Sequence, residues 1–222
     1  MSYEAYAAAR AAILTGASKR IPAASAASQA RALGLWDGKS PAVASDAQLG
    51  LLLDLGVFDP VAGHSPALER EARMNPPTPG SEAERVLRGL EQTRITLFRI
   101  AGPHDQGGVW VDDLLRGMPV HLWDAGLARP GQEGVGYGGR LMPIDGYEMT
   151  CGVLAPLSDG ILDALLGYPQ LDGPPPTAMP LLTPPDAEML VALRSLASKA
   201  DFLLSLYREA LRSGLMGEPP RR

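Results

Sequence analysis

Residues 109–123, with the sequence VWVDDLLRGMPVHLW, and residues 141–154, with the sequence LMPIDGYEMTCGVL, decide the fold. Each stretch holds two runs of β-branched and large apolar residues around a two-residue spacer, Arg116-Gly117 in the first and Asp145-Gly146 in the second. Such spacers predict β-hairpins, most clearly at Asp-Gly, where both residues tolerate positive φ. Residues 93–101 add a fifth run of strand type. Five strands so close together leave no room for crossover helices, and therefore predict an antiparallel small β-barrel or curved sheet.

Helix-forming sequence surrounds these strands and predicts an α+β protein. The stretches with helical apolar spacing or capping residues before the strands are residues 2–16, 25–35, 45–57, 66–74 and 81–92. The sequence divides into a helical N-terminal region (1–92), a β-barrel-like domain with a short helix (93–167), a proline-rich connector (168–185) and one long C-terminal helix (186–214). The connector is expected to be stiff, because its composition opposes both helix and central strand.

The C-terminal helix carries the spacing of a coiled-coil seam. Its apolar positions alternate in steps of four and three: Met189, Leu193, Leu196, Ala200, Leu203, Tyr207 and Leu211. Further apolar residues widen this stripe, which favours a helix packed on its own domain. A homodimer formed through residues 186–211 is the alternative.

Composition excludes several classes of protein. The 222 residues carry a formal net charge of -5, and no segment has the basic surface that nucleic-acid binding requires. Cys151 is the one cysteine, so no intramolecular disulfide can form. No signal peptide and no run of about 18 apolar residues is found, which predicts a cytoplasmic protein without a membrane span. Seventeen arginines against three lysines indicate a GC-rich, bacterial genome.

The first hairpin supplies the candidate binding site. If Arg116-Gly117 is a two-residue turn, Trp110 lies opposite Trp123 and Asp112 lies opposite His121. These four side chains share one face of the hairpin, and the other face is the core. Two aromatic rings beside a carboxylate and an imidazole can stack on a planar ligand or hold a partner's side chain.

This arrangement has a structural alternative and depends on the strand register. The tryptophans can instead pack beneath the N-terminal helices, with Asp112 simply holding His121. A longer loop, or a bulge at Gly117, would also change which residues face each other. The favoured function is a non-enzymatic cytoplasmic binding or adaptor protein for a protein or small-molecule partner. The alternatives are a small enzyme with His121 as general base beside Asp112, covered by a lid at residues 134–139, and a structural oligomer subunit.

Other reactive residues fit no known catalytic or cofactor pattern. Cys151 alternates with core positions of its strand, which predicts a buried thiol. Residues 134–139 match the G-x-G-x-x-G pattern formally, but they precede a strand and do not open a helix, so no dinucleotide site is predicted. The histidines and the lone cysteine lack metal-ligand spacing, and we expect neither metal nor cofactor. Residues 111–117 and 140–146 resemble small β-barrel modules of bacterial proteins, a resemblance that implies no activity.

Overall fold

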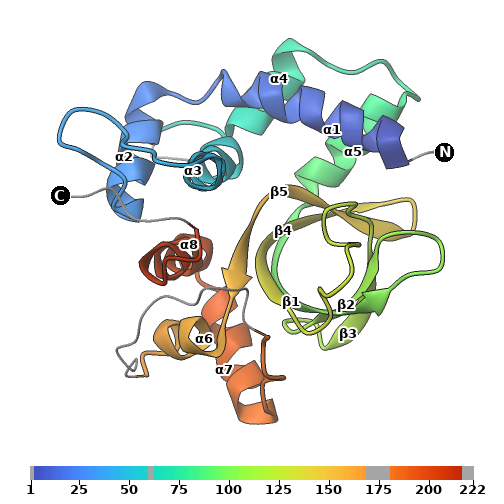
Figure 1. Cartoon of the computed structure of the whole chain (residues 1–222). Helices are drawn as coiled ribbons and strands as arrows, with labels where there is room; N and C mark the ends of the chain where they lie inside the picture. Colours follow the sequence, from blue (N-terminus) through green and yellow to red (C-terminus); the bar gives the residue numbers. More distant parts are fainter. Residues whose placement is uncertain (1–2, 60–62, 169–180, 217–222) are drawn as a thin grey trace.

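The computed structural model describes residues 3–59, 63–168 and 181–216. Its architecture confirms the α+β class: helices come first, then a mixed sheet of five strands that closes into a ring, then further helices (Figure 1). Within these ranges, no helix has both the length and the apolar character needed to cross a bilayer.

The elements follow the order expected from the sequence. The N-terminal helices are α1 (Tyr3–Ser18), α2 (Ala23–Leu33), α3 (Asp46–Phe58), α4 (Ala67–Met74) and α5 (Glu82–Glu91). The strands are β1 (Arg94–Pro103), β2 (Val109–Asp113), β3 (Met118–Leu122), β4 (Gly136–Ile144) and β5 (Tyr147–Leu157). The helices after the strands are α6 (Asp159–Leu165), α7 (Ala187–Ala197) and α8 (Phe202–Arg212).

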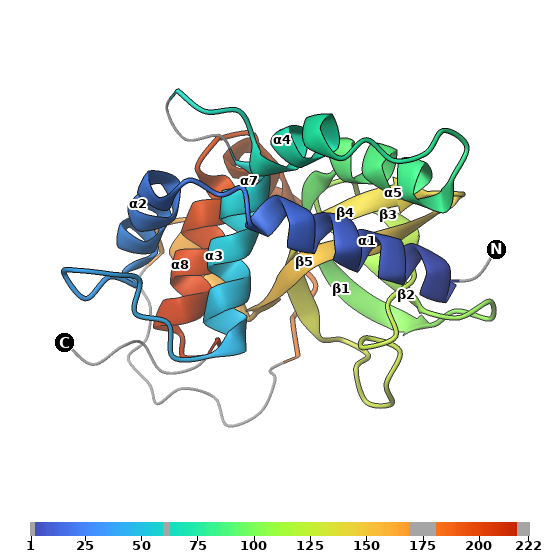
Figure 2. The same ribbon diagram turned by 90° about the horizontal axis from the view of Figure 1, so that it is seen from above.

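The N-terminal helices are confirmed, and two of them begin at capping serines. Ser45 Oγ accepts a hydrogen bond from the Gln48 backbone N–H, and Ser81 Oγ accepts one from Glu84, each 3.2 Å long. These bonds satisfy backbone N–H groups that have no partner inside the helix. α1 packs on α4 and α5, and α5 packs on β4, so these helices cover one side of the ring (Figure 2).

The strand ring is mixed, which corrects the prediction of an antiparallel barrel. The strands follow the order β1-β2-β3-β5-β4, and β4 pairs with β1 to complete the ring. All neighbours are antiparallel except β3 and β5, which are parallel and joined at one residue pair, Leu122 with Glu148. The ring is therefore closed by a single bridge and differs from a regular barrel. Apolar side chains such as Phe98, Val111 and Leu141 fill its interior.

The two hairpins differ in how well the sequence predicted them. Asp145 and Gly146 adopt φ values of 44° and 89°, so the second hairpin has the expected two-residue turn. In the first hairpin, Asp113 pairs with Met118, and the loop has four residues instead of the predicted two. Asp113 Oδ1 accepts hydrogen bonds from the backbone N–H groups of Leu115 (3.0 Å) and Arg116 (2.9 Å). A carboxylate that binds its own loop stabilises this longer turn.

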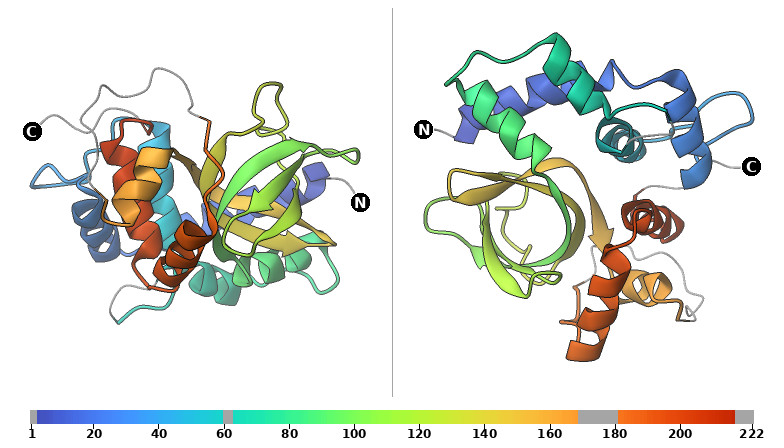
Figure 3. Two further views of the ribbon diagram at one scale, coloured as in Figure 1. Left: turned by 90° about the horizontal axis from the view of Figure 1, so that it is seen from below. Right: turned by 180° about the vertical axis from the view of Figure 1, so that it is seen from behind.

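The predicted long C-terminal helix is wrong, because the chain breaks between α7 and α8 at residues 198–201. Ser198 Oγ donates a hydrogen bond to the Ser195 carbonyl (2.7 Å), and the Lys199 N–H donates to Leu196 (3.0 Å). This break lets α8 turn back and pack against α2, α3, α6 and β5 (Figure 3). Most of the predicted connector, at residues 169–180, lies outside the described residues.

The glycine-rich segment predicted as a lid is part of the sheet. Gly136 begins β4, and Gly138 pairs with Leu97 of β1 and Ala155 of β5. A Cβ at Gly138 would lie 2.5 Å from Leu206 Cδ2 of α8. The glycines therefore allow α8 to approach the strand closely, and they do not cover the tryptophan face.

Candidate functional site

The four residues predicted as a site lie on the outer face of the β2–β3 hairpin. Their pairing is shifted, because the four-residue loop places Trp110 opposite His121 and Asp112 opposite Pro119. The predicted pairs, Trp110 with Trp123 and Asp112 with His121, are therefore wrong. A shift of two residues leaves every side chain on the same face, since strand side chains alternate with a period of two. The predicted grouping of side chains thus survives, although its register does not.

His121 stacks on His104, a residue from the loop between β1 and β2. The ring centroids are 3.5 Å apart and the planes differ by 4°. His121 Nε2 donates to the Gly107 carbonyl (2.8 Å), and His104 Nδ1 accepts from the Gln106 N–H (3.0 Å). These partners assign the proton to Nε2 of His121 and leave Nδ1 of His104 unprotonated.

The two tryptophans of this face have different surroundings. Trp123 stacks on Tyr3 of α1, with centroids 5.5 Å apart, and contacts Tyr147 of β5 at 4.9 Å. The ring of Trp110 lies beside that of His104, with centroids 4.6 Å apart, but 42% of the Trp110 surface stays exposed. Trp123 therefore helps to join α1 to the ring, whereas Trp110 presents a ring to solvent.

Asp112 does not orient His121. Its carboxylate forms an ion pair with Arg99 of β1, at 3.7 Å, and the imidazole of His121 is held by Gly107. A general base usually needs a group that fixes its tautomer. Here that group is a backbone carbonyl on the outer surface, an arrangement that a purely structural histidine also has.

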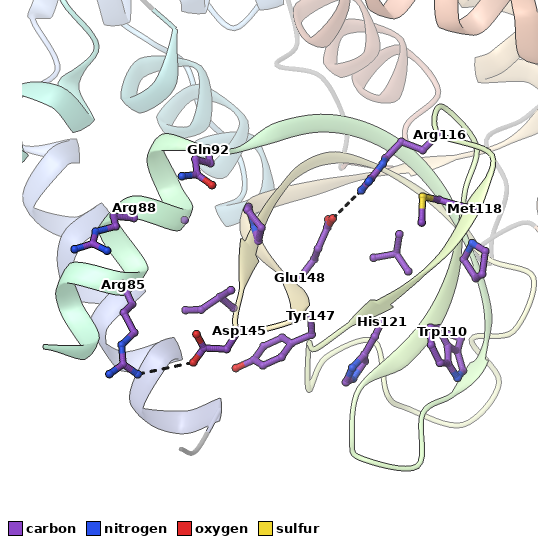
Figure 4. Close-up of a pocket in the computed structure, with 16 residues that line it drawn as sticks. Arg85, Arg88, Gln92, Trp110, Arg116, Met118, His121, Asp145, Tyr147 and Glu148 are labelled. Carbon is purple, nitrogen blue, oxygen red and sulfur yellow. Dashed lines mark hydrogen bonds and ion pairs between the residues drawn. The ribbon is translucent and has the colours of Figure 1, made fainter. Parts of the chain in front are cut away.

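A groove of about 650 Å³ opens beside His121 (Figure 4). One wall is α5, a second is the outer face of β2 and β3, and the third is the turn between β4 and β5. The side chains and backbone that line it are those of Arg85, Arg88, Gly89, Gln92, Trp110, Arg116, Met118, Pro119, Val120, His121, Pro143, Ile144, Asp145, Gly146, Tyr147 and Glu148.

The groove exists because β3 and β5 separate after their single bridge. The Trp123 backbone N–H donates to the Glu148 carbonyl (2.8 Å), and residues 118–121 of β3 have no paired strand on that side within the described chain. Backbone groups alternate in direction along a strand, so those of Pro119 and His121 point to the same side as those of Trp123. Pro119 has no N–H, as is typical of a free strand edge.

An ion network joins β1, β5 and the loop between β2 and β3 beside the groove. Glu148 is buried and accepts hydrogen bonds from Arg94 Nε (3.2 Å) and Nη2 (2.6 Å). Arg116 Nη1 donates to the same carboxylate at 3.3 Å. Arg94 also pairs with the buried Asp113, at 2.5 Å. Arg94 is shared between two carboxylates, so Arg116 helps to neutralise Glu148. The other N–H groups of the Arg116 guanidinium stay available to a ligand, since 46% of the side chain is exposed.

The α5 wall adds two further arginines. Arg88 pairs with Glu84 on the same helix (2.7 Å), and Arg85 lies 3.9 Å from Asp145. On the facing wall, burial raises the pKa of Tyr147 to about 12. The Tyr147 hydroxyl therefore remains protonated at neutral pH and can donate a hydrogen bond. The lining contains three arginines and two carboxylates, and the Glu84 carboxylate that pairs with Arg88 is not part of it.

Sequence reasoning missed much of this groove. In the sequence, the three arginines of the groove resemble the ordinary charged residues of a helix face or a turn: Arg85, Arg88 and Arg116. Tyr147 resembles an ordinary strand residue. A hint lay in Pro119, because a proline inside a strand indicates an unpaired edge. No local pattern indicates that α5 lies beside that edge.

The cysteine and the possible metal ligands considered in the sequence form no reactive site among the described residues. Cys151 is buried as predicted, and burial raises the pKa of its thiol well above the ordinary value, which opposes a nucleophilic role. No group of three or more histidine, cysteine, aspartate or glutamate side chains that could hold a metal occurs in the described ranges.

Comparison with known proteins identifies a family. No curated protein and no solved structure matches the chain significantly. A family model, described as a family of unknown function (DUF7986), matches residues 11–168, which include the N-terminal helices from within α1, all five strands and α6. The match covers more than half of the 222 residues. The chain therefore belongs to the family of unknown function DUF7986.

Proposed function

We propose that the protein is a non-enzymatic binding protein of the bacterial cytoplasm that holds an extended acidic segment of a partner protein in the groove beside β3. The observation that carries this proposal is the edge of β3. Residues 118–121 run along the groove, and no strand of the described part of the chain pairs with them there, between Arg88 of α5 and Arg116.

An unpaired strand edge is a template for an extended peptide. A bound segment would form main-chain hydrogen bonds to the edge, and its alternate side chains would point into the groove. Pro119 removes one donor from this edge, which limits pairing to a short segment. The single bridge at Leu122 leaves the groove open at its other end.

Charge complementarity favours an acidic segment. Arg88 is 64% exposed and Arg116 is 46% exposed, and they flank the groove from different elements. Guanidinium groups bind carboxylates with two parallel hydrogen bonds, which gives direction as well as attraction. The carboxylates of the groove are occupied by its own arginines, since Glu148 contacts Arg94 and Asp145 contacts Arg85.

Apolar contacts would come from Trp110, on the hairpin face that the sequence indicated, and from Met118, at the start of β3. Trp110 and Met118 are 42% and 47% exposed and line the same groove. Aromatic residues and arginine dominate binding energy at protein interfaces, and methionine adapts its shape to a partner. Trp110 and His121 thus keep a proposed binding role, whereas Trp123 and Asp112 support the surrounding structure.

The test uses a random peptide library displayed against the whole chain, followed by fluorescence anisotropy with the enriched peptides. We expect enrichment of extended sequences rich in Asp and Glu. Arg88→Glu should weaken their binding about tenfold or more, because it replaces attraction with repulsion. Arg73→Glu is the matched control, since Arg73 on α4 is 62% exposed and forms the same kind of i,i+4 pair with a glutamate.

Three outcomes would contradict the proposal. These are enrichment without acidic residues, equal loss of binding in the two variants, and unchanged binding in Trp110→Ala. A second copy of the chain as the occupant would appear as a dimer in light scattering that Arg88→Glu dissociates. The homodimer through residues 186–211 stays a prediction, although α8 already buries its apolar side chains within its own chain.

A further inference from the structure

The loop between β2 and β3, residues 114–117, carries one of the three arginines that line the groove. From this loop Arg116 reaches Glu148, and its Nη1 donates to the carboxylate at 3.3 Å (Figure 4). Arg116 is exposed, so the place of its backbone depends on the contacts that hold the loop. A binding group loses less conformational entropy when its backbone is already held in place.

A buried carboxylate holds the N–H groups of this loop. Asp113 Oδ1 accepts hydrogen bonds from the backbone N–H groups of Leu115 (3.0 Å) and Arg116 (2.9 Å). The same oxygen accepts a hydrogen bond from Thr96 Oγ1 (2.8 Å), which fixes the carboxylate to β1. A carboxylate accepts hydrogen bonds and donates none, so it cannot hold carbonyl groups. The carbonyls of the loop therefore need a donor from another part of the molecule or from water.

Arg194 of α7 supplies that donor. Its Nε donates to the Leu115 carbonyl (2.8 Å), and its Nη2 donates to the Leu114 carbonyl (3.4 Å). One guanidinium thus binds two successive carbonyls of the loop. A guanidinium holds its N–H groups in one plane, and hydrogen bonds from a charged donor are stronger than those between neutral groups. The loop is consequently held through its N–H groups by Asp113 and through its carbonyls by Arg194.

Gly117 leaves room for this guanidinium. A Cβ at position 117 would lie 2.8 Å from Arg194 Nη2, so a side chain there would push the guanidinium away. Gly117 also adopts a φ of 71°, a conformation that residues with a side chain rarely accept. The last residue of the loop therefore permits both the turn and the close approach of Arg194.

The helix that carries Arg194 is distant from the loop in the sequence. Leu193 is the buried residue of α7, and it belongs to the same apolar cluster as Leu114. Arg194 follows it directly, so the polar contacts with the loop begin next to the point at which α7 enters the core. α7 lies outside residues 11–168, which the family model matches, whereas the loop lies inside them.

We propose that Arg194 is a positioning residue of the groove, which fixes the β2–β3 loop from α7 and so holds Arg116 in place for a carboxylate of the bound segment. This inference rests on the proposed function, in which Arg116 contacts the acidic partner. Arg194 binds the loop carbonyls and acts only through Arg116. Displacement of α7 would therefore lower the affinity of the groove, although no residue of α7 lines it.

The first test measures the loop itself, without a ligand. Hydrogen exchange of the Leu115 and Arg116 amides, followed by NMR, should become at least about tenfold faster in Arg194→Gln, because the loop opens more often without the guanidinium. Arg194→Lys keeps the charge without the planar pair of donors and should also exchange faster than the wild type. Arg212→Gln is the matched control, since Arg212 is an exposed arginine of α8 that pairs with Glu209. Unchanged exchange in Arg194→Gln would overturn the proposal.

The second test measures the binding of a fluorescein-labelled hexaglutamate peptide by fluorescence anisotropy. Arg116→Gln should weaken binding about fivefold, and Arg194→Gln should weaken it about threefold. The double variant should bind as weakly as Arg116→Gln alone, because Arg194 has no effect once Arg116 is gone. A merely structural arginine would lower the affinity equally in both backgrounds, and that additive result would show the proposal to be wrong.

The two tests together separate this inference from the proposed function. If the wild-type chain does not bind hexaglutamate but Arg194→Gln speeds exchange, the acidic partner is wrong and the contact of Arg194 with the loop is upheld. If the peptide binds, and Arg194→Gln speeds exchange without weakening binding, Arg116 needs no positioning and the inference fails.

Discussion

Arg94, the first residue of β1, donates two hydrogen bonds to Glu148, the second residue of β5. Glu148 is also the residue through which β5 pairs with β3. One side-chain contact therefore supports the point at which the strand ring closes, and Glu148 also lines the groove.

Glu148→Gln should destabilise the fold. The substitution removes the negative charge that faces Arg94 in a mostly buried position, so we expect a loss of about 2 kcal/mol in the free energy of unfolding. Urea denaturation measures it. Asp112→Asn is the control, because its ion pair with Arg99 is half exposed at 3.7 Å and should change stability by no more than about 0.5 kcal/mol. Similar values for both variants would show that Glu148 does not support ring closure.

Substitution of Trp123 should mainly lower stability, whereas substitution of Trp110 should mainly weaken binding. Trp123→Ala removes the ring that lies between Tyr3 and Tyr147 and should cost about 2 kcal/mol of stability. Trp110→Ala removes a partly exposed ring and should cost about 0.5 kcal/mol, while it weakens peptide binding. Chemical denaturation of both variants checks this. If Trp110→Ala is the more destabilising of the two, the assignment of roles is reversed.

Tyr147 should affect stability at alkaline pH. Its folded-state pKa is raised to about 12 by burial, above an ordinary value near 10. The folded chain therefore retains a proton that the unfolded chain releases, and stability falls as the pH rises from about 10 to 12. Tyr147→Phe lacks this group, so its stability should fall less across that window. If the free energy of unfolding falls by the same amount in both proteins between pH 9 and pH 12, the prediction is wrong.

Asp54 should make stability depend on pH above its ordinary titration range. Burial raises its folded-state pKa above the unfolded value of about 3.9, so the folded state binds the proton more tightly. Stability relative to Asp54→Asn should therefore fall as the pH rises from about 4 through the raised pKa. Arg140, Tyr207 and Asp59 face the same carboxylate but are common to both chains. A pH-independent difference between the two chains would show that the pKa is unchanged on folding.

Features set by neighbours in sequence could be predicted well. The Asp145-Gly146 turn follows from two adjacent residues that accept positive φ, and both do so in the structure. The serine caps and the alternation that gathers Trp110 and His121 on one face are equally local. The first hairpin shows the limit of such reasoning. Its loop is lengthened by Asp113, whose buried carboxylate also meets Thr96 and Arg94 of a different strand.

The sequence by itself determined the α+β class, the N-terminal helices, the strands and the shared face of the hairpin, because propensity, capping and side-chain alternation act over a few residues. Tertiary structure alone decided that β3 meets β5 at one bridge, that the C-terminal helix breaks so that α8 can pack, and that α5 stands beside the free edge of β3. The groove depends on these long-range placements. Packing among segments that are distant in the sequence determines these placements, and no local sequence pattern predicts them.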